Sequence, residues 1–82
     1  MKINKAFSLR VKELLKEKNM TQYELAQETG LYHSTLSDIL NCKYKTANFM
    51  NMSLIIKALG ISFSKFFDSE IFSFSNLIMQ EK

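Results

Sequence analysis

Apolar residues recur along most of the chain at the spacing of amphipathic helices, and short polar stretches separate the runs. The first apolar stripe consists of Phe7, Val11, Leu14 and Leu15. Charged residues occupy the opposite face of this run, which predicts a helix over about residues 7–18 with one buried side. Asn19 is expected to end this helix. Residues 1–5 precede the stripe, and we expect them to form a frayed arm.

Two short helices around a tight turn are predicted between residues 22 and 41. Thr21 and Glu24 form the Thr-x-x-Glu pattern of a capping box, which marks the start of the first helix. Gly30 is expected to end it, because a residue without Cβ enters the left-handed region at little cost. The second helix has apolar residues at helical spacing: Leu36, Ile39 and Leu40. Its other positions carry short polar side chains, which predicts a helix that is braced from behind and offers polar groups to a partner.

The second half of the chain predicts two more helices and a C-terminal extension. Asn48 is expected to cap a helix whose apolar stripe is Phe49, Met52, Ile55, Ile56 and Leu59. Gly60 closes that helix, and Ser62 caps a short one that contains Phe63, Phe66 and Phe67. Met and Phe at this spacing are typical of a core or a dimer interface. The apolar period of residues 71–79 fits both a helix and a strand, and we favour the helix.

The spacing over residues 22–41 resembles the helix-turn-helix of phage repressors and Cro proteins, a large family of bacterial regulators related to the xenobiotic-response-element type. The matching positions are Gln22, Leu25, Ala26, Gly30, Leu31, Leu36 and Ile39. The likeness covers roughly residues 5–68. It implies an all-α fold with a compact five-helix lambda-repressor-like domain over residues 1–68. Residues 69–82 lie outside the likeness and form a short C-terminal extension, which we expect to be helical.

Three positions depart from the pattern of the family. Tyr32 stands where the family places a Ser or Thr cap, so the helix is expected to start at His33 or Ser34, or to be capped by phosphate or water. Leu15 and Leu40 stand where many members carry a buried Arg–Glu pair. Two apolar residues can replace such a pair as a unit, which predicts a core contact between the first and third helices. Cys42 replaces a preferred Gly, and we interpret it as a structural residue rather than a reactive or metal-binding thiol.

Base recognition in a major groove needs short or planar polar groups at the exposed start of a helix. The candidates for base reading are Tyr32, His33, Ser34, Thr35, Ser37 and Asp38. The resemblance assigns Tyr32, His33, Ser34 and Asp38 to the base-contacting positions of the family. For each candidate the alternative is an ordinary solvated face. Asp38 would meet a cytosine amino group or serve only as a surface charge.

Phosphate contacts need amide or cationic groups on both sides of the groove. Gln22 begins a helix, where the free amides and the macrodipole favour an anion, and the resemblance assigns it this role. The second group of candidates follows the recognition helix and consists of Asn41, Lys43 and Lys45. Arg10 could reach a phosphate or pair with a nearby carboxylate. Tyr44 could stack on a sugar or pack on the domain.

Composition narrows these interpretations. The chain has 82 residues and a net charge of +3. That length suits one small domain that is often helped by dimerisation, and a basic balance suits a polyanion partner. The single Cys42 fits a reducing, cytoplasmic setting. Lys65, Asp68 and Glu70 interrupt the most apolar stretch, so no membrane span is expected. No nucleophile–base set is visible, so we expect neither an enzyme nor a cofactor or metal.

The sequence therefore predicts a DNA-binding regulator that recognises specific double-stranded sequences. We expect a bacterial or phage repressor or autoregulator that binds a palindromic operator as a homodimer, joined through the region from Phe63 to Met79. The alternative is a protein-interaction module, antitoxin-like or a dimerisation unit, with weak DNA binding. The apolar C-terminal extension and the acidic Asp38 on the reading face motivate this alternative.

Overall fold

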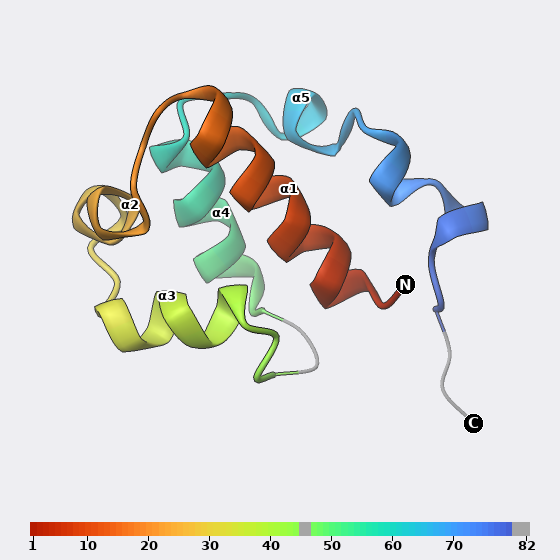
Figure 1. Ribbon diagram of the computed structural model, residues 1–82, viewed down its shortest axis with the longest axis horizontal. Coiled ribbons are helices and arrows are strands. Elements are labelled where there is room, and N and C mark those ends of the chain that lie inside the picture. Colours follow the sequence, from red (N-terminus) through yellow and green to blue (C-terminus); the bar gives the residue numbers. More distant parts are fainter. Residues whose placement is uncertain (45–46, 80–82) are drawn as a thin grey trace.

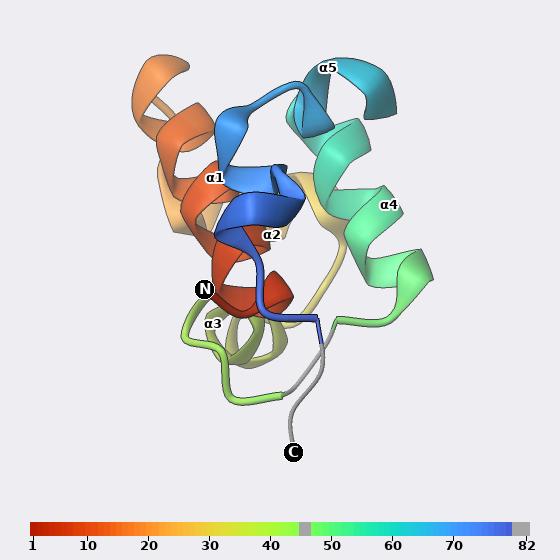
Figure 2. The ribbon, with the colours of Figure 1, turned by 90° about the vertical axis from the view of Figure 1, so that its right-hand side faces the viewer.

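The computed structural model describes residues 1–44 and 47–79, and that part of the chain folds as five α-helices followed by two single 3-10 turns (Figure 1). The helices are α1 (Ile3–Glu17), α2 (Gln22–Thr29), α3 (His33–Leu40), α4 (Phe49–Ala58) and α5 (Phe63–Phe67). The turns are η1 (Glu70–Phe72) and η2 (Phe74–Asn76). Helix α1 runs through the middle of the molecule, with α3 on one side of it and α5 on the other (Figures 1 and 2). The predicted all-α fold is confirmed.

Local capping signals start α2, α4 and α5 where the sequence predicts. The Thr21 hydroxyl accepts from the Glu24 amide at 3.0 Å, and the Glu24 carboxylate accepts from the Thr21 amide at 3.1 Å. Asn48 caps α4 by accepting from the Asn51 amide at 2.8 Å. Ser62 caps α5 in the same way. Each bond satisfies an amide that a helix start would leave without a partner, a contribution of about 1 kcal/mol per cap.

All five helices contribute to one hydrophobic core. Each supplies a side chain with no exposed surface: Val11, Leu25, Leu36, Ile55 and Phe66. Leu15 and Leu40 both belong to this core, as the replacement of a charged pair predicts. Burying one such side chain stabilises the fold by roughly 1.5–3 kcal/mol. The core therefore holds the recognition helix α3 against α1 and α2.

The N-terminus is ordered, so the predicted frayed arm is wrong. Helix α1 begins at Ile3, four residues before the stripe suggests. Ahead of it, the Met1 carbonyl accepts from the Ile78 amide at 2.7 Å, and Lys2 forms an isolated parallel bridge with Ile78. The Met1 ammonium group also donates to the Asn76 carbonyl. The C-terminal segment thus ties down the first residues.

Over its described residues, 69–79, the C-terminal extension is helical only in two short turns, and the backbone is extended at Leu77. Ser69 caps η1 by accepting from the Ile71 amide at 3.3 Å, and Ser73 separates η1 from η2. Serine side chains compete with the backbone for hydrogen bonds, which favours turns over a continuous helix. The extension packs across α1, as Figure 2 shows. Phe72 lies on the core, with its ring centroid 4.9 Å from that of Phe67 and 5.9 Å from that of Phe66.

Candidate nucleic-acid interface

The recognition helix α3 lies at the edge of the molecule, and its polar side chains reach solvent (Figure 1). Tyr32 precedes the helix, 82% exposed and without a capping bond, and His33 is the first helical residue. This confirms the first of the expected helix starts. His33 and Ser34 are exposed, whereas the other three base-reading candidates are half-buried: Thr35, Ser37 and Asp38. The predicted reading surface is therefore most exposed on the first turn of α3.

Hydrogen bonds from α1 and α2 brace the end of α3 and the turn that precedes it. The Ser8 hydroxyl, fully buried, donates to the Leu40 carbonyl at 2.5 Å and so satisfies a carbonyl at the helix end. The Thr29 hydroxyl donates to the Ala26 carbonyl at 3.0 Å and accepts from the Leu31 amide at 3.1 Å. Gly30 completes the turn with a φ of +76°. The turn and the C-terminal end of α3 are thereby fixed before any ligand binds.

A residue outside the predicted set stands beside the reading surface. The Tyr23 ring stacks on the His33 imidazole, with centroids 4.6 Å apart and an angle of 24° between planes. Tyr23 is the second residue of α2 and is 63% exposed. Its position directly after the predicted phosphate contact Gln22 was the available signal in the sequence. The pairing with His33 depends on how α2 crosses α3, which spacing alone does not reveal.

The predicted phosphate-binding residues lie at opposite ends of α3. Gln22 is the exposed neighbour of Tyr23, so it lies near the start of α3, whereas Asn41 and Lys43 follow the end of that helix. A helix with its side chains is roughly 10–12 Å across, so α3 can enter a major groove about 12 Å wide. Lys45 lies outside the described residues.

Side-chain bonds link the loop after α3 back to the helix. Lys43 Nζ lies 3.7 Å from Asp38 Oδ2, and the Tyr44 hydroxyl donates to the same oxygen at 3.4 Å. The Asn41 amide donates to the Ser37 hydroxyl at 3.2 Å. The negative charge of Asp38 is therefore partly balanced by the Lys43 ammonium group and the Tyr44 hydroxyl. Ser37 already has one hydrogen bond within the protein.

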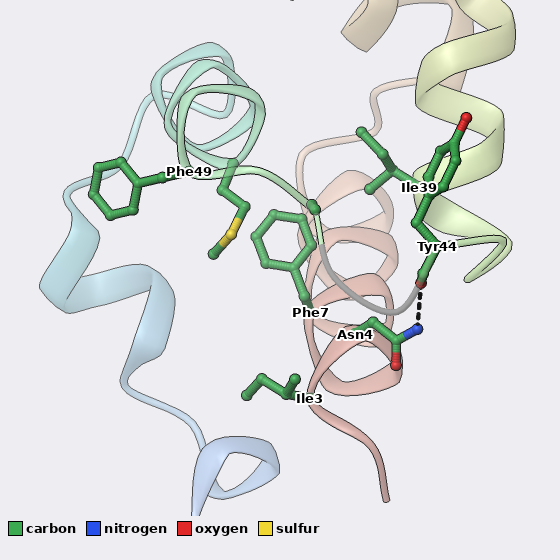
Figure 3. Close-up of a pocket in the computed structure, with 8 residues that line it drawn as sticks. Ile3, Asn4, Phe7, Ile39, Tyr44 and Phe49 are labelled. Atoms are coloured by element: carbon green, nitrogen blue, oxygen red, sulfur yellow. Dashed lines mark hydrogen bonds between the residues drawn. The ribbon is translucent and has the colours of Figure 1, made fainter. Parts of the chain in front are cut away.

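A hollow of about 280 Å³ lies on the inner side of α3, apart from the polar face (Figure 3). Its lining comes from the start of α1, the end of α3, the loop that follows and the start of α4: Ile3, Asn4, Phe7, Ile39, Tyr44, Ala47, Phe49 and Met52. The Asn4 amide at its edge donates to the Tyr44 carbonyl at 2.7 Å, a bond drawn in Figure 3. This bond attaches the loop after α3 to the first turn of α1.

Arg10 is engaged in contacts within the protein. Its Nε donates to the Phe66 carbonyl at 2.7 Å and its Nη2 to the Lys65 carbonyl at 2.9 Å, while Nη1 pairs with Glu13. The residue is 8% exposed, and its guanidinium lies over the Phe66 ring. Of the two predicted roles, pairing with a carboxylate is confirmed. Arg10 also holds α5 by binding its last carbonyls, a role that the sequence did not suggest.

A comparison with protein families supports this arrangement. The family described as Cro/C1-type HTH DNA-binding domain matches residues 10–70. The chain belongs to this family, and membership supports a DNA-binding regulator of transcription. Comparisons with curated proteins and with solved structures gave no match. Among the described residues, no helix is both long and apolar enough to cross a membrane.

Proposed function

We propose that the protein is a cytoplasmic repressor or autoregulator that binds a palindromic operator as a homodimer. The observation that carries the proposal is the geometry of α3. Its first turn offers exposed polar side chains, its inner side is fixed to the core, and phosphate-binding candidates lie beyond both of its ends. Polar side chains on a recognition helix read base edges, and contacts to phosphates set the register of the protein on the duplex.

The division of tyrosines and phenylalanines over the surface supports the same assignment. All three tyrosines of the chain lie at the helix-turn-helix or its loop, and each is more than half exposed: Tyr23, Tyr32 and Tyr44. The exposed phenylalanines lie instead on α4, α5 and the C-terminal extension: Phe49, Phe63, Phe67 and Phe74. Tyrosine combines an apolar ring with a hydrogen-bonding group, which suits a wet interface with nucleic acid.

The apolar side is the proposed dimer interface. Within the predicted region, Phe63 is 50% exposed, Phe74 79% and Met79 59%. Phe49 from the start of α4 extends this surface, because its exposed ring stacks on Phe63 at 6.3 Å between centroids. Large exposed apolar patches mark interaction surfaces. A dimer also suits the DNA, since a single α3 reaches only a few base pairs.

Selection of bound sequences from a random duplex pool tests the proposal. We expect an enriched operator with two-fold symmetry, bound by two chains, with affinity that falls steeply as salt rises. Enrichment of a single asymmetric half-site would contradict the dimer. Enrichment of no sequence, with salt-sensitive binding to all of them, would contradict base reading.

A second candidate function is a protein-interaction module with weak DNA binding. The exposed phenylalanine surface favours it, because such a surface also suits a partner of another kind. The two functions separate in a gel shift on random genomic fragments. A regulator shifts duplex DNA strongly at low salt, whereas binding to no duplex even at low salt would favour the interaction module.

A further inference from the structure

His33 and Tyr23 form an exposed stack that joins the start of α3 to the start of α2. The rings are 4.6 Å apart with 24° between their planes, the offset geometry that aromatic rings prefer. His33 is the first residue of α3, so no preceding helical turn confines its side chain. Tyr32, directly before it, is 82% exposed and makes no capping bond. Tyr23 is therefore the neighbour that restricts the imidazole.

The stack leaves the hydrogen-bonding edge of His33 open. Stacking uses the face of the imidazole, whereas Nδ1 and Nε2 donate and accept in the plane of the ring. Over residues 1–44 and 47–79, neither of these nitrogens has a hydrogen-bond partner. A planar group held in one orientation, with its polar edge free, is what discrimination among base edges requires. Fixing the ring in advance also lowers the entropy lost on binding.

We infer that Tyr23 is a positioning residue that sets the orientation of His33 and thereby sharpens the base preference at the pair His33 contacts. This inference rests on the proposed function. It gives Tyr23 a role through its ring, not through its hydroxyl. A phosphate or sugar contact by that hydroxyl is the competing role, and the two roles differ in what Tyr23→Phe does.

The first experiment examines the free protein by NMR. His33 is the single histidine of the chain, so its ring protons are readily assigned. We expect the ring current of the aromatic side chain at position 23 to shift these protons in the wild type and in Tyr23→Phe, and the shift to disappear in Tyr23→Ala. Tyr23 is exposed, so both variants should remain folded, which circular dichroism checks. Equal shifts in all three proteins would show that no stack forms in solution and would overturn the inference.

The second experiment measures base preference on the selected operator and its single-base variants. Tyr23→Ala should lower discrimination about 2- to 10-fold at the same base pair as His33→Ala. Tyr23→Phe should match the wild type, and the double variant Tyr23→Ala/His33→Ala should discriminate no worse than His33→Ala. An effect of Tyr23→Ala on all sequences alike, or a matching loss in Tyr23→Phe, would overturn the inference in favour of a backbone contact.

The outcomes separate failure of the inference from failure of the proposed function. A wild-type protein that binds no duplex overturns both. A wild-type protein that reads the base pair through His33, while Tyr23→Ala keeps full discrimination there, overturns only the role of Tyr23.

Discussion

Lys43 and Asp38 form an ion pair across the end of the recognition helix, with Nζ 3.7 Å from Oδ2. The cation that the sequence assigns to phosphate thus has an anionic partner in the free protein. Both side chains reach solvent, the Lys43 side chain being 66% exposed. Exposed pairs of this kind contribute only about 0–1 kcal/mol. A DNA phosphate can therefore take Lys43 from Asp38 at little energetic cost.

Replacing Asp38 by Asn should strengthen binding to duplexes of every sequence. The change removes a negative charge near the phosphates and releases Lys43 from its pair. The Tyr44 hydroxyl can still donate to the amide oxygen, so the loop should keep its conformation. Titration of operator and random duplexes at the same salt concentration measures the effect. A loss of preference confined to one base pair would show instead that Asp38 reads a cytosine.

Replacing Lys43 by Ala should weaken binding to all sequences alike. If Lys43 neutralises one phosphate, the plot of log K against log salt should become less steep, its negative slope shrinking in magnitude by roughly 0.9. Lys65→Ala is the matched control, since Lys65 is exposed on α5, on the other side of α1 from α3 (Figure 1). Lys45→Ala is expected to act as Lys43→Ala does. If the slope is unchanged in both Lys43→Ala and Lys45→Ala, the loop after α3 does not contact phosphate.

Capping residues and apolar periodicity were enough to predict the helices and most of the core, because both act over a few neighbouring residues. Thr21, Asn48 and Ser62 are examples, each bonded to an amide three residues ahead. The contacts that sequence reasoning missed join distant segments. Ser8 bonds Leu40, 32 residues away. Such pairs depend on helix crossings, which local rules do not specify.

In the exposed part of the site, too, the sequence predicts the local features but not the contacts that depend on tertiary folding. The turn geometry predicts that Ser34 and His33 reach solvent, and the structure agrees. The ties of Asp38 to Lys43 and Tyr44 depend on how the loop folds back, so the sequence alone left Asp38 as an isolated charge. Phe49 fits the predicted apolar stripe of α4 and yet is 76% exposed. It is the first residue of that helix, and whether another segment covers this end depends on the tertiary fold.

Arg10→Met should destabilise the fold without changing how the folded protein binds DNA. Methionine fills similar space but leaves the Phe66 carbonyl without the donor that Arg10 supplies, whereas the Lys65 carbonyl keeps the Asp68 amide. An unsatisfied buried group costs about 1–3 kcal/mol. Urea unfolding measures the loss, and DNA titrations well below the transition test binding. A lower salt slope in the folded variant would mean that Arg10 contacts a phosphate after all.

Cys42→Gly should stabilise the protein. Cys42 has a φ of +59°, in the left-handed region that costs a residue with Cβ roughly 1–2 kcal/mol. Glycine removes that strain but adds freedom to the unfolded chain, so the expected net gain is about 1 kcal/mol or less. Asn19→Gly is the matched control, because Asn19 has a φ of +54° but asparagine tolerates this region. Thermal melts should show a larger rise for Cys42→Gly; equal changes would contradict strain at Cys42.

The dimer is best tested by single changes on its proposed surface. Truncation after Asp68 would remove Phe72 from the core and the partners of Met1, so it would confuse assembly with folding. Phe63→Ser and Phe74→Ser instead alter side chains that are 50% and 79% exposed.

Each serine variant should give a folded monomer with much weaker operator binding and an unchanged contact pattern, whereas Phe74→Leu should still dimerise. The wild-type dimer should hold its recognition helices roughly 34–36 Å apart, one turn of duplex. Light scattering at micromolar concentration reports the assembly state. A monomeric wild type, or serine variants that dimerise fully, would assign the phenylalanine surface to another partner.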